Sequence, residues 1–228
     1  MPDLDRIVFY GRTLDEYRRF FALDPDSLKG AAVLDCPAGA SSFTAEAFAM
    51  GIHAVAFDAM YGPNLKAMMD SGLEDIDHVV DAVAKEKQKY IWDYYHDLDG
   101  LKKQRAEALQ KFSEDYPGGA MENRYFSGRL PVLPFEDEVF DLVLSGHFLF
   151  CYSDRLDYAF HKAAILEMLR VTSGEVRIYP LTTLTLEPCG FVNDIIADLD
   201  KNKITAEIAP VPFEFVKGAN QMLRVYRK

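Results

Sequence analysis

The chain has 228 residues, of which 49% are hydrophobic and 27% are charged. This balance is typical of a folded globular protein and excludes an intrinsically disordered one, and the length suffices to bury a sizeable core. The formal net charge of -11 disfavours nucleic acid as a partner, because binding to a polyphosphate relies on clustered Lys and Arg side chains.

The first sixty residues predict a strand–helix–strand unit. After an amphipathic helix over residues 14–21, the apolar run 30–35 predicts a strand buried on both faces of a parallel sheet. A turn of small residues follows, and residues 43–50 predict a helix that ends at Gly51. A second strand over 53–58 completes the unit, whose crossover should be right-handed.

Residues 60–122 form a longer connection than one crossover requires. Apolar residues recur at helical spacing from 76 to 101 and resume at 109–112. We expect a break at Asp99-Gly100 and an end at residues 117–119. This segment is predicted to be a helical insertion, a lid that covers the carboxyl edge of the sheet.

An aromatic cluster, Tyr90, Trp92, Tyr94 and Tyr95, lies in this insertion. It predicts either a pocket for a substrate or a homodimer seam, and core packing within the lid is the plainer alternative.

The rest of the chain continues the alternation of strands and helices. Strands are expected over residues 124–127, 139–145, 175–179, 204–209 and 221–226. Helices are expected over 157–171 and 191–199, with Gly174 separating the first helix from the strand that follows it. The last two strands should pair antiparallel because no helix separates them. Residues 1–228 are therefore predicted to form one α/β domain: a Rossmann-like, open, mostly parallel sheet with helices on both faces and a C-terminal antiparallel strand pair.

Metal and membrane sites are disfavoured by spacing and composition. Cys36, Cys151 and Cys189 lack metal-ligand spacing, and His78 and His96 lack the i, i+4 spacing of a helical metal site. The acidic N-terminus does not resemble a targeting segment, and no stretch reaches the roughly 18 apolar residues of a membrane span. We expect no bound metal, no membrane partner and a cytoplasmic location.

Two strand ends point to a ligand crevice. In an open α/β sheet the ligand binds beyond the carboxyl ends of the strands. The turn 35–41 and Asp58 fall at two such ends, where backbone groups and a carboxylate that accepts from ribose hydroxyls would face each other. A plain tight loop and a helix N-cap are the alternatives for these two features.

These segments resemble the class I S-adenosylmethionine-dependent methyltransferases. Residues 33–43 (VLDCPAGASSF) resemble the family's glycine-rich first motif, and Asp58 resembles its acid after the second strand. Residues 133–145 (LPFEDEVFDLVLS) resemble its LPF-x-D-x-x-FDLV segment, which is the most specific match. The resemblance covers residues 30–228 with the insertion set aside, and it implies methyl transfer from S-adenosylmethionine to an acceptor, expected to be a small molecule.

The chain departs from the family pattern at two places. Only Gly39 remains of the three glycines of the first motif, with Pro37 and Ser41 at the flanking positions. Gly128-Arg129 stands where many members carry Gly-Asp to contact adenine. A guanidinium has no acceptor lone pair, so adenine would be read by backbone groups near Arg129 and Leu130 or by stacking.

The resemblance implies a set of site residues. Asp35 and the Ala38–Gly39 backbone would line the methionine end, and Asp58 the ribose. In the leading segment the Arg12 guanidinium would pair with the methionine carboxylate, and ordinary surface and staple roles are the alternative for Tyr10 and Arg12. The full set implied for the cofactor is Tyr10, Arg12, Asp35, Ala38, Gly39, Asp58, Ala59, Arg129, Leu130, Ser145 and Gly146.

His147, after the fourth strand, is the candidate catalytic residue. As a general base it would need a pKa near neutrality. The other interpretation is a pocket wall, since displacement at an activated methyl group needs positioning rather than acid–base chemistry.

Two other functions stay open. The reduced glycine motif is compatible with a protein that binds S-adenosylmethionine or S-adenosylhomocysteine without catalysis. A nicotinamide oxidoreductase would use Tyr158, Lys162 and Ser145, but the glycine pattern of that class is absent.

Overall fold

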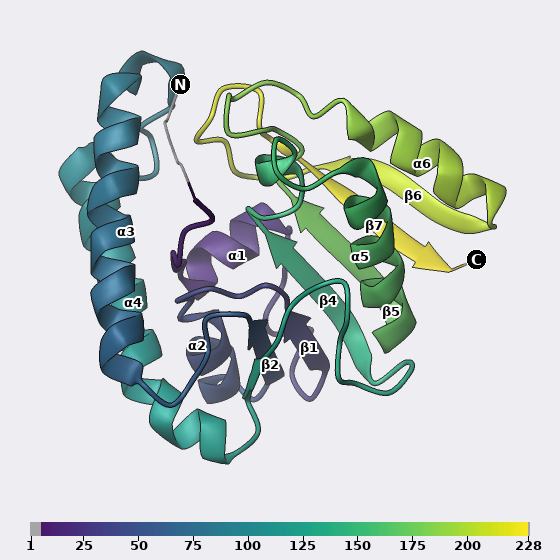
Figure 1. The fold of residues 1–228 in the computed structure, drawn as a ribbon, viewed down its shortest axis with the longest axis horizontal. Helices are drawn as coiled ribbons and strands as arrows, with labels where there is room; N and C mark the ends of the chain where they lie inside the picture. Colours follow the sequence, from purple (N-terminus) through teal and green to yellow (C-terminus); the bar gives the residue numbers. More distant parts are fainter. Residues whose placement is uncertain (1–5, 228) are drawn as a thin grey trace.

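Residues 6–227 are described by the computed structural model, and their strands form one seven-stranded sheet in the order β3-β2-β1-β4-β5-β7-β6 (Figure 1). The strands are β1 (Ala32–Asp35), β2 (His53–Asp58), β3 (Tyr125–Ser127), β4 (Phe140–Gly146), β5 (Thr172–Tyr179), β6 (Ile204–Pro210) and β7 (Gln221–Arg227). Strands β1 to β5 pair in parallel, whereas β7 is antiparallel to both β5 and β6. The predicted fold class, including the C-terminal antiparallel pair, is confirmed, and it agrees with the resemblance to class I methyltransferases.

The six α-helices described are α1 (Leu14–Phe20), α2 (Phe43–Ala49), α3 (Leu65–Lys85), α4 (Leu98–Met121), α5 (Tyr158–Val171) and α6 (Phe191–Lys201). Among them, α1, α3, α4 and α5 begin at a side-chain cap, whereas α2 and α6 do not. Thr13 and Glu16 form a capping box at α1, and the Asp157 side chain accepts from the backbone N–H of Phe160 at the start of α5. None of the helices described is long and apolar enough to cross a membrane.

Helices cover both faces of the sheet because its central strands are apolar on both sides. Leu34 and Val143 pack in a core with α5 and α6, whereas Val33 and Leu142 pack on the opposite face in a core with α1 and α2. These alternate residues all have 4% exposure or less, as expected for strands buried on both faces.

Helices α3 and α4 pack against each other as a long pair at one side of the molecule (Figure 1). Helix α4 also contacts α2 and β3, and its Phe112 packs with Tyr125 of β3 in a third core cluster. Helix α4 is therefore the crossover between β2 and β3, and α3 lies against it. The function of this pair as a lid stays a prediction.

Two predicted interruptions of the insertion are wrong. Asp99 and Gly100 lie in the first turn of α4, where the Asp97 side chain accepts from the Gly100 N–H at 2.8 Å. Pro117 lies inside the same helix, which continues to Met121. Pro117 removes one backbone donor, and the turn of α4 that follows it packs against Arg124 and Tyr125 at the start of β3.

The tyrosine-rich segment between α3 and α4 is not helical, contrary to the helical spacing read from its apolar residues. Tyr90 pairs with Val216 in an isolated antiparallel bridge, and the Ile91 N–H donates to the Phe215 carbonyl at 2.7 Å. Pairing with a segment more than 120 residues away decides the conformation here, although the spacing of apolar residues favours a helix. Such a tertiary contact cannot be predicted from the periodicity of one segment.

The predicted break at Gly174, between helix α5 and strand β5, is wrong. Gly174 lies inside β5. The pairing of β4 with β5 shifts register between Phe140 and Leu142, and a Cβ on Gly174 would lie 2.1 Å from the Asp141 carbonyl oxygen. Glycine is needed here for close backbone approach at an irregularity in the ladder.

We expect Gly174→Ala to lower the free energy of unfolding by roughly 1–3 kcal/mol or more, because the added methyl group must displace backbone. Gly190→Ala is the matched control, since a Cβ there meets nothing within 4 Å. Urea denaturation of both variants measures the difference. Equal stabilities would show that the β4–β5 ladder accommodates the methyl group.

Candidate functional site

A cavity of about 620 Å³ lies at the carboxyl ends of β1 to β5, within the usual size of a small-molecule site. Its wall also includes the N-terminal segment, α3, α4 and the connection between β6 and β7. Ten of the predicted residues line it: Tyr10, Arg12, Ala38, Gly39, Asp58, Ala59, Arg129, Leu130, Gly146 and His147. Asp35 and Ser145 do not line it.

Asp35 and Ser145 are fully buried beside the cavity instead of in its wall. The Tyr17 hydroxyl donates to Asp35 Oδ2 at 2.8 Å, and Tyr17 takes the place at the cavity that the sequence assigned to Asp35. Burial raises the pKa of Asp35 well above its usual range. Asp35 Oδ1 and Ser145 Oγ have no hydrogen-bond partner among the residues described.

The turn after β1 is held by Asp58 at the end of β2. Asp58 accepts from the Gly39 N–H at 2.9 Å and from the Met60 N–H at 2.8 Å, one bond to each carboxylate oxygen. Gly39 has a φ of +59°, and a Cβ there would lie 2.8 Å from the Tyr10 carbonyl oxygen. Burial raises the pKa of Asp58, and the two backbone donors oppose this rise. Each oxygen keeps a lone pair for a further donor.

The N-terminal segment, residues 6–12, lies directly on this turn. The Arg12 carbonyl accepts from Ser41 Oγ at 2.8 Å, and a Cβ on Gly11 would lie 1.9 Å from the Ala40 carbonyl oxygen. Farther along, the Phe9 N–H donates to Asp75 of α3 at 2.6 Å. These contacts place Tyr10 and Arg12 in the cavity wall.

Arg12 carries a charge that its neighbours do not neutralise. Its guanidinium makes no ion pair or side-chain hydrogen bond within residues 6–227, and it lies 5.1 Å from the Tyr10 ring centroid and 5.9 Å from that of Phe20. An unpaired guanidinium at a cavity in a chain of net charge -11 is suited to bind an anionic ligand group.

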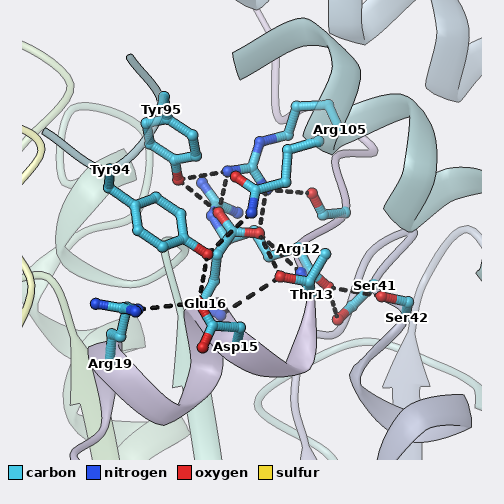
Figure 2. A network of polar contacts seen from close by, with 12 residues as sticks. Arg12, Thr13, Asp15, Glu16, Arg19, Ser41, Ser42, Tyr94, Tyr95 and Arg105 are labelled. Carbon is cyan, nitrogen blue, oxygen red and sulfur yellow. Dashed lines mark hydrogen bonds and ion pairs between the residues drawn. The ribbon is translucent and has the colours of Figure 1, made fainter. Parts of the chain in front are cut away.

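A buried ion pair connects α1 to α4 beside the cavity (Figure 2). Glu16 is 0% exposed and Arg105 is 1% exposed. Arg105 donates to both Glu16 oxygens and to the Gly11 carbonyl at 2.8 Å. Tyr95 donates to Glu16 at 2.5 Å, and the Thr13 N–H donates to the same carboxylate at 2.8 Å. Burial alone would raise the pKa of Glu16, but Arg105 holds it below the usual range.

His147 lies in the cavity wall with a buried, unpartnered Nδ1. Its ring centroid is 4.8 Å from that of Phe20 and 5.2 Å from that of Tyr179, and its φ of +54° is unusual for a residue with a side chain. Burial, assisted by the charges of Arg12 and Arg105, lowers its pKa well below the usual value. A neutral imidazole of this kind is a weak base near neutral pH, which favours the wall interpretation.

The residues of the oxidoreductase alternative lie elsewhere. Tyr158 and Lys162 both bind Asp198 of α6, at 2.8 and 2.9 Å, and neither lines the cavity. Cys151 does line it, but burial raises its pKa to about 12, so it is a neutral thiol rather than a nucleophile.

Arg105→Met should lower the free energy of unfolding by about 3–5 kcal/mol, because it leaves the Glu16 charge buried without a partner. Adding Glu16→Gln should recover part of this loss. Lys102→Met is the control on the same helix, since its ion pair with Asp77 is exposed and worth at most about 1 kcal/mol. Equal losses for the two single variants, by urea denaturation, would contradict the assignment.

The stability that neutral burial of His147 contributes should be present above its unfolded pKa near 6.5 and decrease as the pH falls. Below that value the unfolded chain binds a proton that the folded chain excludes, so stability should fall by up to about 1.4 kcal/mol per pH unit. His147→Asn should lose less stability than the wild type between neutral and mildly acidic pH. Parallel curves would show that His147 is protonated in the folded state. Asp35 and Asp58 titrate in both proteins and cancel in the comparison.

Comparisons with known proteins support a family assignment. No family model matches the chain. It is 32% identical over 226 residues to the uncharacterized protein MJ0045 of Methanocaldococcus jannaschii, a match that covers 99% of this chain and 98% of that protein.

Solved structures with a similar arrangement have low sequence identity. The magnesium protoporphyrin IX methyltransferase of Synechocystis PCC 6803 with bound S-adenosylhomocysteine is 15% identical, with a TM-score of 0.49 over 94% of this chain and 81% of that one. A TehB-like methyltransferase of Corynebacterium glutamicum is 16% identical, with a TM-score of 0.46 over 89% and 84%. On the sequence match over nearly the whole of both proteins, the chain belongs to the same family as the M. jannaschii protein.

Proposed function

We propose that the chain binds S-adenosylmethionine in this cavity and transfers its methyl group to a small-molecule acceptor. The observation that carries the proposal is the meeting of three groups in one cavity: the Gly39 turn, the Asp58 carboxylate and the unpaired Arg12 guanidinium. They lie at the carboxyl ends of β1 and β2, where open α/β sheets bind their ligands. The sequence resemblance supports the same assignment.

The residues present fit the parts of this cofactor. Asp58 is 8% exposed and keeps lone pairs for the two ribose hydroxyls. Arg12 suits the carboxylate of the methionine part. Arg129 and Leu130 line the cavity after β3, where adenine would be read by backbone groups because a guanidinium has no acceptor.

The bound cofactor supplies a methyl group that is already activated by a positive sulfur. The protein's contribution is then to hold the acceptor in line and to exclude water, which needs no general base. Gly146 and His147 at the end of β4 line the cavity and would border the reacting atoms. The lowered pKa of His147 accords with a wall residue that stays neutral.

Binding without catalysis is the second candidate. The N-terminal segment rests on the Gly39 turn through the Gly11 and Tyr10 backbone, so it covers the place where the methionine part would lie. If this segment does not admit an acceptor, the protein would hold the cofactor or its demethylated product only. Release of S-adenosylhomocysteine in the presence of candidate acceptors separates the two functions.

We expect Arg12→Gln to weaken S-adenosylhomocysteine binding by about 10- to 100-fold, because a charge-assisted pair with the carboxylate is lost. The variant should bind 5′-methylthioadenosine, which lacks that carboxylate, as well as the wild type does. Calorimetric titration of both ligands measures this difference directly.

Arg18→Gln removes an exposed charge from the adjacent helix α1 and should change neither affinity. A wild type that binds a nicotinamide cofactor and neither adenosyl ligand would overturn the proposed function. Equal losses for the two ligands in Arg12→Gln would place Arg12 away from the carboxylate.

A further inference from the structure

One part of the cavity is distant in sequence from the strand ends and differs from them in chemistry. We call it the insertion lobe. It is lined by α3, the 90–95 segment, α4 and the connection between β6 and β7, through Val79, Ala82, Val83, Tyr90, Tyr95, Leu101, Arg105, Phe213, Phe215 and Val216.

An aromatic wall runs along this lobe. Ring centroids are 4.6 Å apart for Tyr90 and Phe215, 4.7 Å for Phe215 and Tyr95, and 6.1 Å for Tyr95 and Phe213. Through Tyr179, whose ring centroid lies 6.4 Å from that of Phe213 and 5.2 Å from that of His147, the wall continues to the end of β4. Rings bound in this lobe would therefore lie on one surface that leads toward the proposed methyl donor.

The wall is fixed before any ligand binds. The Tyr90–Val216 bridge, the Ile91 N–H bond to Phe215 and the Lys217 N–H bond to Lys89 join the two segments that carry the rings. On the α3 side Val79 and Val83 supply aliphatic surface. A preformed slot between aromatic and aliphatic side chains suits a flat ring system.

The lobe offers no counter-charge to a ligand. Among its described lining residues only Arg105 is charged, and Glu16 neutralises it with the same two oxygens that Tyr95 and Thr13 also bind. A charged group placed here would lose its hydration without gaining a counter-charge, which costs several kcal/mol, and a cation would recover only part of this cost from the faces of the rings.

Two polar groups of the lobe make no hydrogen bond to residues 6–227: the Tyr90 hydroxyl and Nε of Arg105, whose other nitrogens bind Glu16. Tyr90 is 6% exposed, and its hydroxyl has no hydrogen-bond partner within residues 6–227. Burial, with Glu86 and Tyr10 nearby, raises its pKa to about 12, so the phenol stays neutral and can donate or accept.

We propose that the insertion lobe selects an uncharged, ring-bearing small molecule as the methyl acceptor, with the Tyr90 hydroxyl as its polar contact. That the bound molecule is a methyl acceptor rests on the proposed function. The preference for an uncharged ring rests on the residues of the insertion lobe alone. Asp58 belongs to the other part of the cavity and is not involved in this choice, and Arg12, 5.9 Å from the Phe20 ring centroid, is assigned to the methionine carboxylate.

Three naphthalene probes of similar size test the charge preference: 2-naphthol, 2-naphthoate and 2-naphthylmethylammonium. We expect 2-naphthol to bind at least about tenfold more tightly than either ion, with and without S-adenosylhomocysteine, because only the ions lose uncompensated hydration. Calorimetry or probe fluorescence at neutral pH gives the three affinities. Equal or tighter binding of either ion would overturn the proposal.

Variants place the probe in the lobe. Val79→Trp should fill the slot and weaken 2-naphthol binding about tenfold or more, whereas Leu73→Trp, on the same helix at a position 51% exposed, should not. Tyr90→Phe keeps the ring and should weaken binding about two- to tenfold by removing one hydrogen bond. Thermal denaturation checks that each variant is folded. Unchanged 2-naphthol affinity in folded Val79→Trp and Tyr90→Phe would overturn the assignment.

The two proposals fail separately. If S-adenosylhomocysteine does not bind but the probes follow the expected order, the cofactor proposal is wrong and the lobe remains a neutral-ring site. If S-adenosylhomocysteine binds and 2-naphthol shows no preference, the lobe proposal is wrong and the cofactor site stands.

Discussion

The buried pair between Glu16 and Arg105 is the constraint on which the cavity depends. It joins α1 to α4, and Arg105 also binds the Gly11 carbonyl, so the N-terminal segment cannot move independently of the helical pair. Arg105 donates through both terminal nitrogens while its Nε has no partner among the residues described, and removing one partner of such a buried pair costs several kcal/mol. The positions of the segment that carries Arg12, the loop that carries Tyr95 and the helix that carries Arg105 are therefore set together.

The turn after β1 shows how the fold works with one glycine where the resembling family uses three. Gly39 alone takes a positive φ, and its N–H is bound by Asp58, so the turn is closed by a side chain from the adjacent strand. The Tyr10 backbone lies where a Cβ on Gly39 would be. The turn, Asp58 and the N-terminal segment thus form one packed unit, and any ligand at this place meets all three.

The sheet could be predicted from the sequence because its strands are short apolar runs, such as 53–58. Strands buried on both faces of a sheet are recognised by such runs. Most of the residues predicted for the site do line the cavity, for a related reason: strand ends in an α/β sheet converge. The sequence-based predictions failed where contacts between distant segments determine the structure. Tyr90 pairs with Val216, and the Tyr17 hydroxyl binds Asp35. The Glu16–Arg105 pair, 89 residues apart, had no local signal, because charge pairing across such a distance leaves no periodicity.

The environment of His147 links the cavity's construction to the chemistry that it permits. The rings of Phe20 and Tyr179 pack against His147, burial removes the stabilisation that a protonated imidazole needs, and the Arg12 and Arg105 charges act in the same direction. Such surroundings disfavour a protonated His147 and therefore do not favour proton removal by this residue near neutral pH. The site is better suited to a displacement whose reactant is already activated, where alignment and exclusion of water supply the rate. The apolar insertion lobe suits the same kind of reaction, because an uncharged ring can be aligned there by packing alone.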